Sequence, residues 1–134
     1  MDKVEVVAAV IVKDNTILAT QRGYGEFKGK WEFPGGKIKI NESKEEALIR
    51  EIKEELNADI KIDKYLTTVE YDYSDFHLTM HTYICSLNSN IELVYHNDNE
   101  LEVDNMVWLD NEDLGNLDWL EADKEIISAY KKGV

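Results

Sequence analysis

Cysteine, proline and basic side chains are all scarce in this sequence, and each scarcity excludes a class of structure. The 134 residues include one cysteine, which excludes an intramolecular disulfide, and one proline with seven glycines, which leaves no room for a low-complexity linker. The sequence has only 15 basic residues and 28 acidic ones, so the net charge is −13. Because so acidic a surface repels a phosphate backbone and an anionic membrane, we expect neither long nucleic acid nor a membrane as a partner.

Long apolar segments are missing as well. The N-terminal run "VEVVAAVIV" is too short to cross a bilayer, and no signal-peptide cleavage site follows it. Cys85 lies in the apolar-rich stretch "MHTYICSL", which is typical of a small buried core residue rather than a catalytic thiol. The three histidines show no zinc-ligand spacing with it. The length suits a single core, so we expect one domain, residues 1–134, in the cytoplasm.

The order of apolar patterns predicts a layered fold. The first run is apolar at nearly every position, which is typical of a central strand covered on both faces. "PGG" at residues 34–36 predicts a tight turn. The order β-β-β-α-β-β-β-α predicts an α/β (α+β) sandwich with a mixed sheet between helices. Strands are expected at residues 4–12, 16–22, 31–33, 59–73, 76–87 and 106–109, and helices at 44–56 and 117–132.

The first helix has a start and a stop in the sequence. Ser43 and Glu46 form a capping-box pattern, S-x-x-E, and Asn57 is a typical left-handed stop. The apolar residues at helical spacing predict the buried stripe, which consists of Leu48, Ile49, Ile52 and Leu56.

Three glutamates of this helix predict a metal site. Glu51, Glu54 and Glu55 stand at i, i+3 and i+4, so their side chains share one sector beside the apolar stripe. Converging carboxylates repel one another, and a hard cation such as Mg²⁺ relieves that repulsion. Taken alone, the triplet has an alternative interpretation as a solvated helix face, with Arg50 and Glu54 as a simple i,i+4 ion pair.

The spacing around these glutamates resembles the signature of the Nudix hydrolases, G-x5-E-x7-R-E-U-x-E-E-x-G-U, where U is a bulky apolar residue. Asn57 replaces the final glycine of the signature, and Ala58 is a small residue at its last apolar position. "WEFPGGK" and "LDWLEAD" look like the MutT-like branch, especially its small enzymes acting on cytidine triphosphates. The matching residues are Gly36, Glu42, Arg50, Glu51, Ile52, Glu54 and Glu55.

The resemblance implies a Nudix-type α/β/α sandwich that hydrolyses a nucleoside diphosphate linked to another group, with Mg²⁺ as cofactor and Mn²⁺ as a possible substitute. It implies that Glu51, Glu54 and Glu55 bind the metal together with the carbonyl of Gly35. A later glutamate, Glu102 or alternatively Glu100, would also bind metal. The catalytic residues would be Glu51, Glu54 and Glu102, with the base being Glu51 or the later glutamate. The remaining motif residues, Gly36, Glu42 and Arg50, would support the site.

Four further residues are candidates for substrate binding. Arg22 and Lys37 are cations that can hold phosphates, although Arg22 also fits a solvated strand end. By resemblance Phe33 would lie against the nucleobase, and its alternative is a core aromatic. Asp123 would face the base edge, where a carboxylate accepts from the N4 amine of cytosine and a protonated carboxyl donates to a purine carbonyl. Its alternative is an N-cap of the last helix. The "YDYSDF" turn is expected near the pocket.

The sequence therefore predicts a MutT-like, Mg²⁺-dependent conversion of a nucleoside triphosphate to the monophosphate and pyrophosphate. CTP, dCTP, 5-methyl-dCTP and 8-oxo-dGTP are the candidate substrates. A nucleotide sugar or dinucleoside polyphosphate is the alternative within the same chemistry. A non-catalytic nucleotide sensor is the alternative from another class, although such modules lose motif glutamates that are present here. A monomer and a homodimer are both compatible with the sequence.

Overall fold

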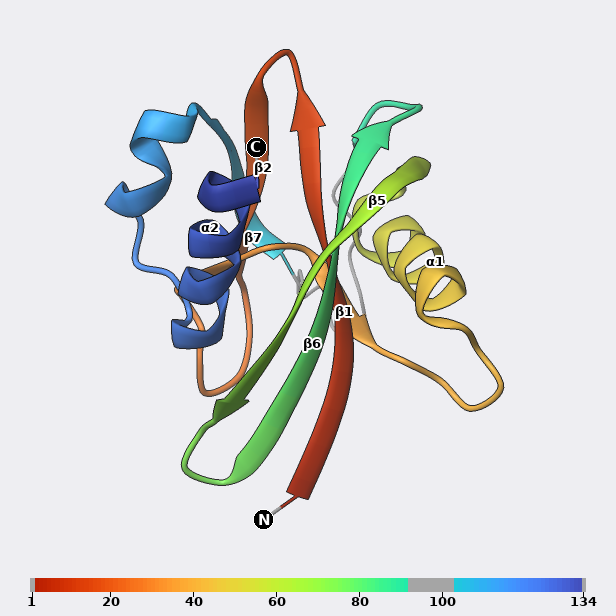
Figure 1. The fold of residues 1–134 in the computed structure, drawn as a ribbon, viewed down its shortest axis with the longest axis vertical. Coiled ribbons are helices and arrows are strands. Elements are labelled where there is room, and N and C mark those ends of the chain that lie inside the picture. The colour runs from red at the N-terminus through yellow and green to blue at the C-terminus, as the bar shows by residue number, and fades with distance from the viewer. Residues whose placement is uncertain (1, 92–102, 134) are drawn as a thin grey trace.

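The computed structural model describes residues 2–91 and 103–133, which form a seven-stranded mixed sheet flanked by helices. Helix α1 covers one face of the sheet and α2 the other (Figure 1). The elements in chain order are β1 Asp2–Lys13, β2 Thr16–Arg22, β3 Trp31–Glu32, β4 Gly35–Lys37, α1 Lys44–Leu56, β5 Ile60–Asp72, β6 Phe76–Leu87, β7 Val103–Leu109, the 3₁₀ helix η2 Asn111–Asn116, and α2 Glu121–Gly133.

Strand β1 organises the sheet, because it pairs with three other strands. Along one edge it runs parallel to β6 from Asp2 to Val12, and β5 follows β6 in antiparallel pairing. Its other edge is shared. The stretch Val6–Ala8 pairs with β4, whereas Val12 and Lys13 pair with β2, which in turn carries β3 and β7. The sheet therefore forks beside the middle of β1.

The core has two layers because successive side chains of β1 point to opposite faces. Val7, Ala9 and Ile11 pack toward α1, and Ala8 and Val10 pack toward α2. The side chains of all five are essentially removed from solvent. The predicted α/β/α sandwich with a central two-faced strand is confirmed.

Helix α1 begins and ends where its sequence predicts. The Ser43 hydroxyl accepts from the Glu46 amide, and the Glu46 carboxylate accepts from the Ser43 amide, which completes the capping box. Asn57 ends the helix at φ 47° and ψ 39°, in the left-handed region. One member of the predicted stripe is wrong: Ile49 is 46% exposed, and Ala47 is buried in its place. The helix is thus rotated so that Ala47 and Leu48 together face the sheet.

Three local predictions are corrected by the sheet and by α2. Gly35 and Gly36 form strand β4 rather than a tight turn, because β1 offers them an unpaired edge at Val7 and Ala8. The last helix begins at Glu121, four residues later than expected, since the preceding backbone bonds β3 through Trp31. Asp123 consequently lies inside the first turn of α2 and is not its N-cap.

Cys85 is buried in the α1-side layer, as predicted, and burial raises the pKa of its thiol to about 12. Within residues 2–91 and 103–133, the helices are all too short or too polar to cross a membrane.

Candidate functional site

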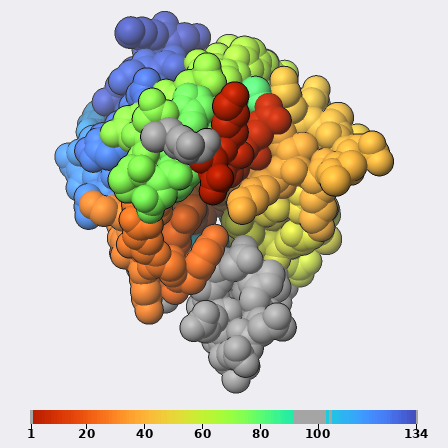
Figure 2. All heavy atoms as spheres, turned by 90° about the horizontal axis from the view of Figure 1, so that it is seen from below, coloured from red at the N-terminus to blue at the C-terminus, as the bar shows by residue number. Residues whose placement is uncertain are grey.

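A cleft of about 540 Å³ opens at the fork of the sheet. Its floor is β1, which contributes Val4, Val6 and Ala8. Its walls come from the β2–β3 loop, the segment through β4, helix α1, the turn between β5 and β6, and the start of α2. Figure 2 views this end of the molecule, where the start of β1 (red), the β2–β3 loop (orange) and the segment leading into α1 (amber) meet. Segments far apart in the sequence thus line one cavity whose volume is typical of a small-molecule site.

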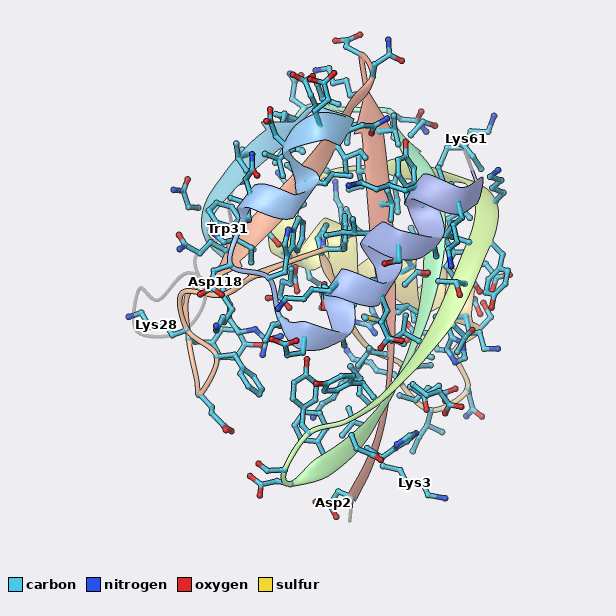
Figure 3. The ribbon with its side chains drawn as sticks, turned by 60° about the vertical axis from the view of Figure 1, so that its left-hand side comes forward. Asp2, Lys3, Lys28, Trp31, Lys61 and Asp118 are labelled. Atoms are coloured by element: carbon cyan, nitrogen blue, oxygen red, sulfur yellow. The ribbon has the colours of Figure 1, made fainter. Side chains whose placement is uncertain are left out.

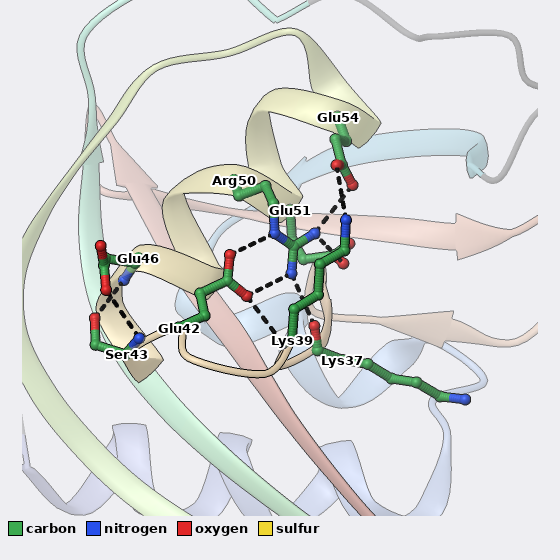
Figure 4. Close-up of polar contacts among 8 residues, drawn as sticks. All are labelled: Lys37, Lys39, Glu42, Ser43, Glu46, Arg50, Glu51 and Glu54. Carbon is green, nitrogen blue, oxygen red and sulfur yellow. Dashed lines mark hydrogen bonds and ion pairs between the residues drawn. The ribbon is translucent and has the colours of Figure 1, made fainter.

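Arg50 lies at the centre of an ion-pair network beside the cleft (Figure 4). Its guanidinium donates to both carboxylate oxygens of Glu42, at 2.6 and 2.9 Å. It also donates to Glu51 at 2.8 Å, to Glu54 at 3.1 Å, and to the backbone carbonyl of Lys37 at 2.9 Å. One side chain therefore connects the loop before α1, strand β4 and two glutamates of the helix.

Electrostatics favour the ionised form of Glu42. The Arg50 guanidinium and the backbone N–H of Lys39 both donate to its carboxylate, and together they hold its pKa at about 2, below the ordinary 4.5. A carboxylate with this pKa stays charged throughout the neutral range. Glu42 is thus a permanent anchor for Arg50.

The three glutamates of the motif separate into two groups. Glu51 and Glu55 line the cleft together with Gly35 and Gly36. Glu54 is about half exposed and pairs with Arg50 and, at 3.9 Å, with Lys39. Over the described residues, no three Asp, Glu, His or Cys side chains are gathered closely enough to enclose a metal ion. Glu54 pairs with Arg50 at i,i+4, as the alternative interpretation of the triplet predicts, and Glu51 contacts the same guanidinium. The metal-binding role of the triplet stays a prediction.

Gly36 permits the position of Glu51. A Cβ added at Gly36 would collide with the carboxylate of Glu51, so only a glycine allows that carboxylate to lie against β4. Glu51 and Glu55 bring carboxylate oxygens to the cleft, the ligand type that Mg²⁺ prefers in proteins. The residues present therefore fit a hard divalent cation.

Arg22 is paired rather than solvated. Its Nε and Nη2 donate to the two carboxylate oxygens of Glu32, at 2.9 and 2.7 Å, and its guanidinium lies 5.3 Å from the ring centre of Tyr24. Arg22, Tyr24 and Glu32 all line the cleft. The sequence does not single out Glu32. The signal for it is the pairing of β2 with β3, which places Arg22 and Glu32 diagonally on one face.

Phe33 and Asp123 also line the cleft and are hydrogen-bonded to each other. The Phe33 ring is buried and stacked on Trp119, with ring centres 4.7 Å apart, so it is a core aromatic that also lines the cleft. Its backbone N–H donates to the Asp123 carboxylate at 2.8 Å. Burial, followed by the negative charge of Glu32, raises the pKa of Asp123 well above its ordinary value. The neutral carboxyl is therefore less disfavoured there than in water, and in that form it can both donate and accept.

Backbone pairing fastens β3 to the segment before α2. Trp31 donates to the carbonyl of Asp118 and accepts from the amide of Leu120, both at 2.9 Å. Figure 3 shows Trp31 and Asp118 side by side, and Lys30 adds an ion pair to the Asp118 carboxylate. This pairing fixes the distance between the Phe33 side of the cleft and the beginning of α2.

The structure places the predicted cation Lys37 at the cleft but does not describe the later glutamate. Lys37 lines the cleft with an exposed side chain, which Figure 4 shows extending away from Arg50. Glu100 and Glu102 lie outside the described residues. The "YDYSDF" turn does reach the cleft, through Tyr73, Asp75 and Phe76.

A comparison with protein-family models matches the NUDIX domain over residues 2–130. The chain belongs to the Nudix family. Among curated relatives, the 8-oxo-dGTP diphosphatase of Proteus vulgaris is 41% identical over 80 residues, which are 58% of this chain and 71% of that protein. The CTP pyrophosphohydrolase of Escherichia coli K12 is 37% identical over 84 residues, which are 62% of each. The second of these alignments thus spans less than two thirds of the relative's length.

Solved structures agree on the Nudix fold. The E. coli ORF135 protein superposes with a TM-score of 0.83 at 28% identity, covering 98% of this chain and 91% of that one. A MutT Nudix hydrolase of Burkholderia pseudomallei has a TM-score of 0.84 at 24% identity, covering 96% and 98%. The fold class and the resemblance to the MutT-like branch of the Nudix pyrophosphohydrolases are confirmed.

Proposed function

We propose that this single Nudix domain hydrolyses a nucleoside triphosphate to the monophosphate and pyrophosphate with Mg²⁺ as cofactor. The observation that carries the proposal is the shared cleft. It is lined both by the carboxylate-bearing Glu51 and Glu55 of α1 and by Phe33 and Asp123, which lie after β3 and in α2. A nucleotide combines anionic phosphates with a planar base, so these two kinds of lining residue match its two parts.

The acidic lining suits phosphates only with a cation. Glu51, Glu54, Glu55 and the Gly35 carbonyl would hold Mg²⁺, with Glu102 as a further ligand. Bound there, the metal supplies positive charge to the phosphate oxygens. Glu54 has to exchange its Arg50 contact for this role, and the loss is small because Arg50 keeps both oxygens of Glu42.

The reaction consumes one water. A bond forms between the water oxygen and the phosphorus of either the α or the β phosphate. The bond from that same phosphorus to the oxygen that bridges the two phosphates breaks, and the bridging oxygen keeps the electron pair and leaves with the other product. The water proton passes to a carboxylate, for which Glu51 and Glu102 are the candidates. Arg50, fixed by Glu42, holds the Glu51 carboxylate in place, and such outer contacts contribute factors of roughly 10–100 in activity.

Phe33 and Asp123 support a cytidine or an oxidised guanine nucleotide. The Phe33 ring offers a flat wall, and Asp123 presents a carboxyl whose raised pKa adds a donor to its acceptor. Relatives named for CTP and for 8-oxo-dGTP agree with these two choices. Arg22 and Lys37 would contact the phosphates, with Arg22 oriented by Glu32.

The test is pyrophosphate release with Mg²⁺ from CTP, dCTP, 5-methyl-dCTP, dGTP and 8-oxo-dGTP, with ADP-ribose and a nucleotide sugar as outsiders. We expect turnover of one triphosphate to exceed the rest. Turnover of the outsiders alone would replace the proposal with hydrolysis of another nucleoside diphosphate derivative. Binding of Mg²⁺ and nucleotide without any turnover would indicate a sensor.

Glu55→Gln tests the metal assignment, because it removes a charge from the cleft while keeping the side chain's shape. We expect turnover to fall by at least about 100-fold, as when a group that stabilises the transition state is removed. Glu125→Gln is the matched control, since Glu125 is an exposed glutamate of α2 outside the cleft. Equal activities of the two variants would contradict the assignment.

A further inference from the structure

The Tyr73 hydroxyl joins two walls of the cleft. Tyr73 lies in the turn between β5 and β6, and its hydroxyl oxygen accepts a hydrogen bond of 3.1 Å from the backbone N–H of Ala122 in α2. The two residues are 49 positions apart in sequence. In Figure 1 the turn between β5 and β6 (green) lies below the first turn of α2 (blue).

This hydrogen bond gives the Ala122 N–H a partner that the helix itself does not provide. The first backbone N–H groups of an α-helix have no partner within the helix, and a polar N-cap side chain normally accepts from one of them. Leu120 precedes α2, and its side chain has no acceptor. Tyr73 supplies the missing oxygen from another element, so the first turn of α2 is positioned by the β5–β6 turn.

The Tyr73 ring is itself held in place. Its centre lies 5.2 Å from that of Phe27, 4.8 Å from Tyr71 and 5.1 Å from Phe76. The backbone of Tyr73 also donates to the Phe76 carbonyl at 2.9 Å. Contacts on several sides leave the hydroxyl little freedom, so it fixes the helix rather than following it.

The residue after Ala122 is Asp123, whose carboxylate accepts from the Phe33 N–H. Tyr73, Asp123 and Phe33 all line the cleft. We propose that Tyr73 is a positioning residue for nucleobase specificity: its hydroxyl sets where the first turn of α2 presents Asp123 to the base. The inference rests on the proposed function, since it requires a nucleotide in the cleft.

Tyr73→Phe removes the hydroxyl and keeps the ring contacts. A neutral hydrogen bond contributes about 0.5–1.5 kcal/mol, which corresponds to a change of about 2- to 10-fold. We expect KM for the preferred triphosphate to rise by that factor while kcat stays nearly constant. We also expect the ratio of kcat/KM between the preferred and the next base to shrink. Tyr71→Phe is the matched control, because it removes a hydroxyl from the neighbouring ring of the same cluster.

A merely structural tyrosine would lower the melting temperature and leave the base ratio unchanged. An unchanged ratio, or a KM rise equal for every base, would therefore overturn the inference. A wild-type protein that turns over none of the panel would overturn the proposed function instead, and the specificity role with it.

Amide hydrogen exchange tests the contact without any nucleotide. We expect the Ala122 amide to exchange faster in Tyr73→Phe than in the wild type or in Tyr71→Phe. Equal exchange rates in all three proteins would show that the hydroxyl does not hold α2, and would overturn the inference irrespective of turnover.

Discussion

Arg50 grips Glu42 with two parallel hydrogen bonds, from Nε at 2.6 Å and from Nη2 at 2.9 Å. The same guanidinium also reaches Glu51 and Glu54 through Nη1. A planar guanidinium can do this because its donors form a fixed fork, whereas the ammonium of lysine is a single point charge. The position of the motif glutamates therefore depends on the shape of Arg50 as well as on its charge.

Arg50→Lys keeps the charge and loses the fork. We expect turnover to fall by roughly 10–100-fold and the Mg²⁺ concentration for half-maximal activity to rise, because Glu51 is no longer held. A Mg²⁺ titration of the initial rate measures both. Lys53→Ala is the control, since Lys53 lies on the same helix as Arg50 and its printed side-chain contact is an exposed ion pair with Asp59, beyond the end of the helix. Equal behaviour of the two variants would refute the role of the fork.

Replacing Gly35 or Gly36 by alanine is expected to cause two different defects. A Cβ at Gly35 would collide with the backbone of Val7 in β1, so Gly35→Ala should lower the melting temperature or prevent folding. The three atoms nearest to a Cβ at Gly36 all belong to the carboxylate of Glu51, the far end of a flexible side chain that can move. Gly36→Ala should therefore stay folded and lose about 100-fold in turnover, the scale expected for displacing a reacting group by 1 Å. Thermal unfolding and turnover of both variants make the comparison, and the reverse pattern would be inconsistent with this geometry.

Asp123→Asn should stabilise the protein, and more so at higher pH. Because the folded pKa of Asp123 is raised above the ordinary 3.8, its full contribution to stability is present below 3.8 and is lost as the pH rises through the folded pKa. Asparagine never ionises, and its carbonyl oxygen can still accept from the Phe33 N–H. Denaturant unfolding at pH 5 and pH 8 should show a larger gain over wild type at pH 8. A gain that does not increase with pH would mean that Asp123 ionises without difficulty.

His77→Gln should destabilise the protein, and the loss of stability should be larger at lower pH. Asp72 and then Glu70 accept from the His77 ring nitrogens, at 2.6 and 3.1 Å, and these hydrogen bonds raise the pKa of His77 above 6.5. The stability from the charged ring is present below pH 6.5 and is lost as the pH rises through the raised value. Unfolding of wild type and variant should therefore differ more at pH 6 than at pH 9. A constant difference would show that the ring is not charged in the folded protein.

Local signals in the sequence were sufficient for α1. Ser43, Glu46 and Asn57 act within a few residues of themselves, so their patterns predict the start and the end of the helix. The rotation of the helix is different, because Ile49 and Ala47 compete for the sheet and only tertiary packing decides between them. The placement of the motif glutamates on one helix and the i,i+4 pairing of Arg50 with Glu54 both follow from helical spacing, whereas the contact of Arg50 with Glu42 depends on the loop before α1.

Long-range partners account for what the sequence could not predict. Nothing near "PGG" indicates that β1 leaves an edge unpaired there, so a strand was mistaken for a turn. The contacts of Arg22 with Glu32 and of Tyr73 with Ala122 join separate elements. Asp123 was predicted to face the cleft by resemblance, but its burial against Phe33 depends on how α2 meets β3.

The fork in the sheet separates the part of the cleft that the fold depends on from the parts that can vary. The floor of the cleft is β1, which also carries both layers of the core, so substitutions there threaten folding itself. Other parts of the walls come from the β2–β3 loop and from the tip of the β5–β6 hairpin, where changes cost the fold little. Residues in these parts of the walls can therefore change while β1 and the core stay intact, which gives a small chain of this kind room to accommodate different ligands.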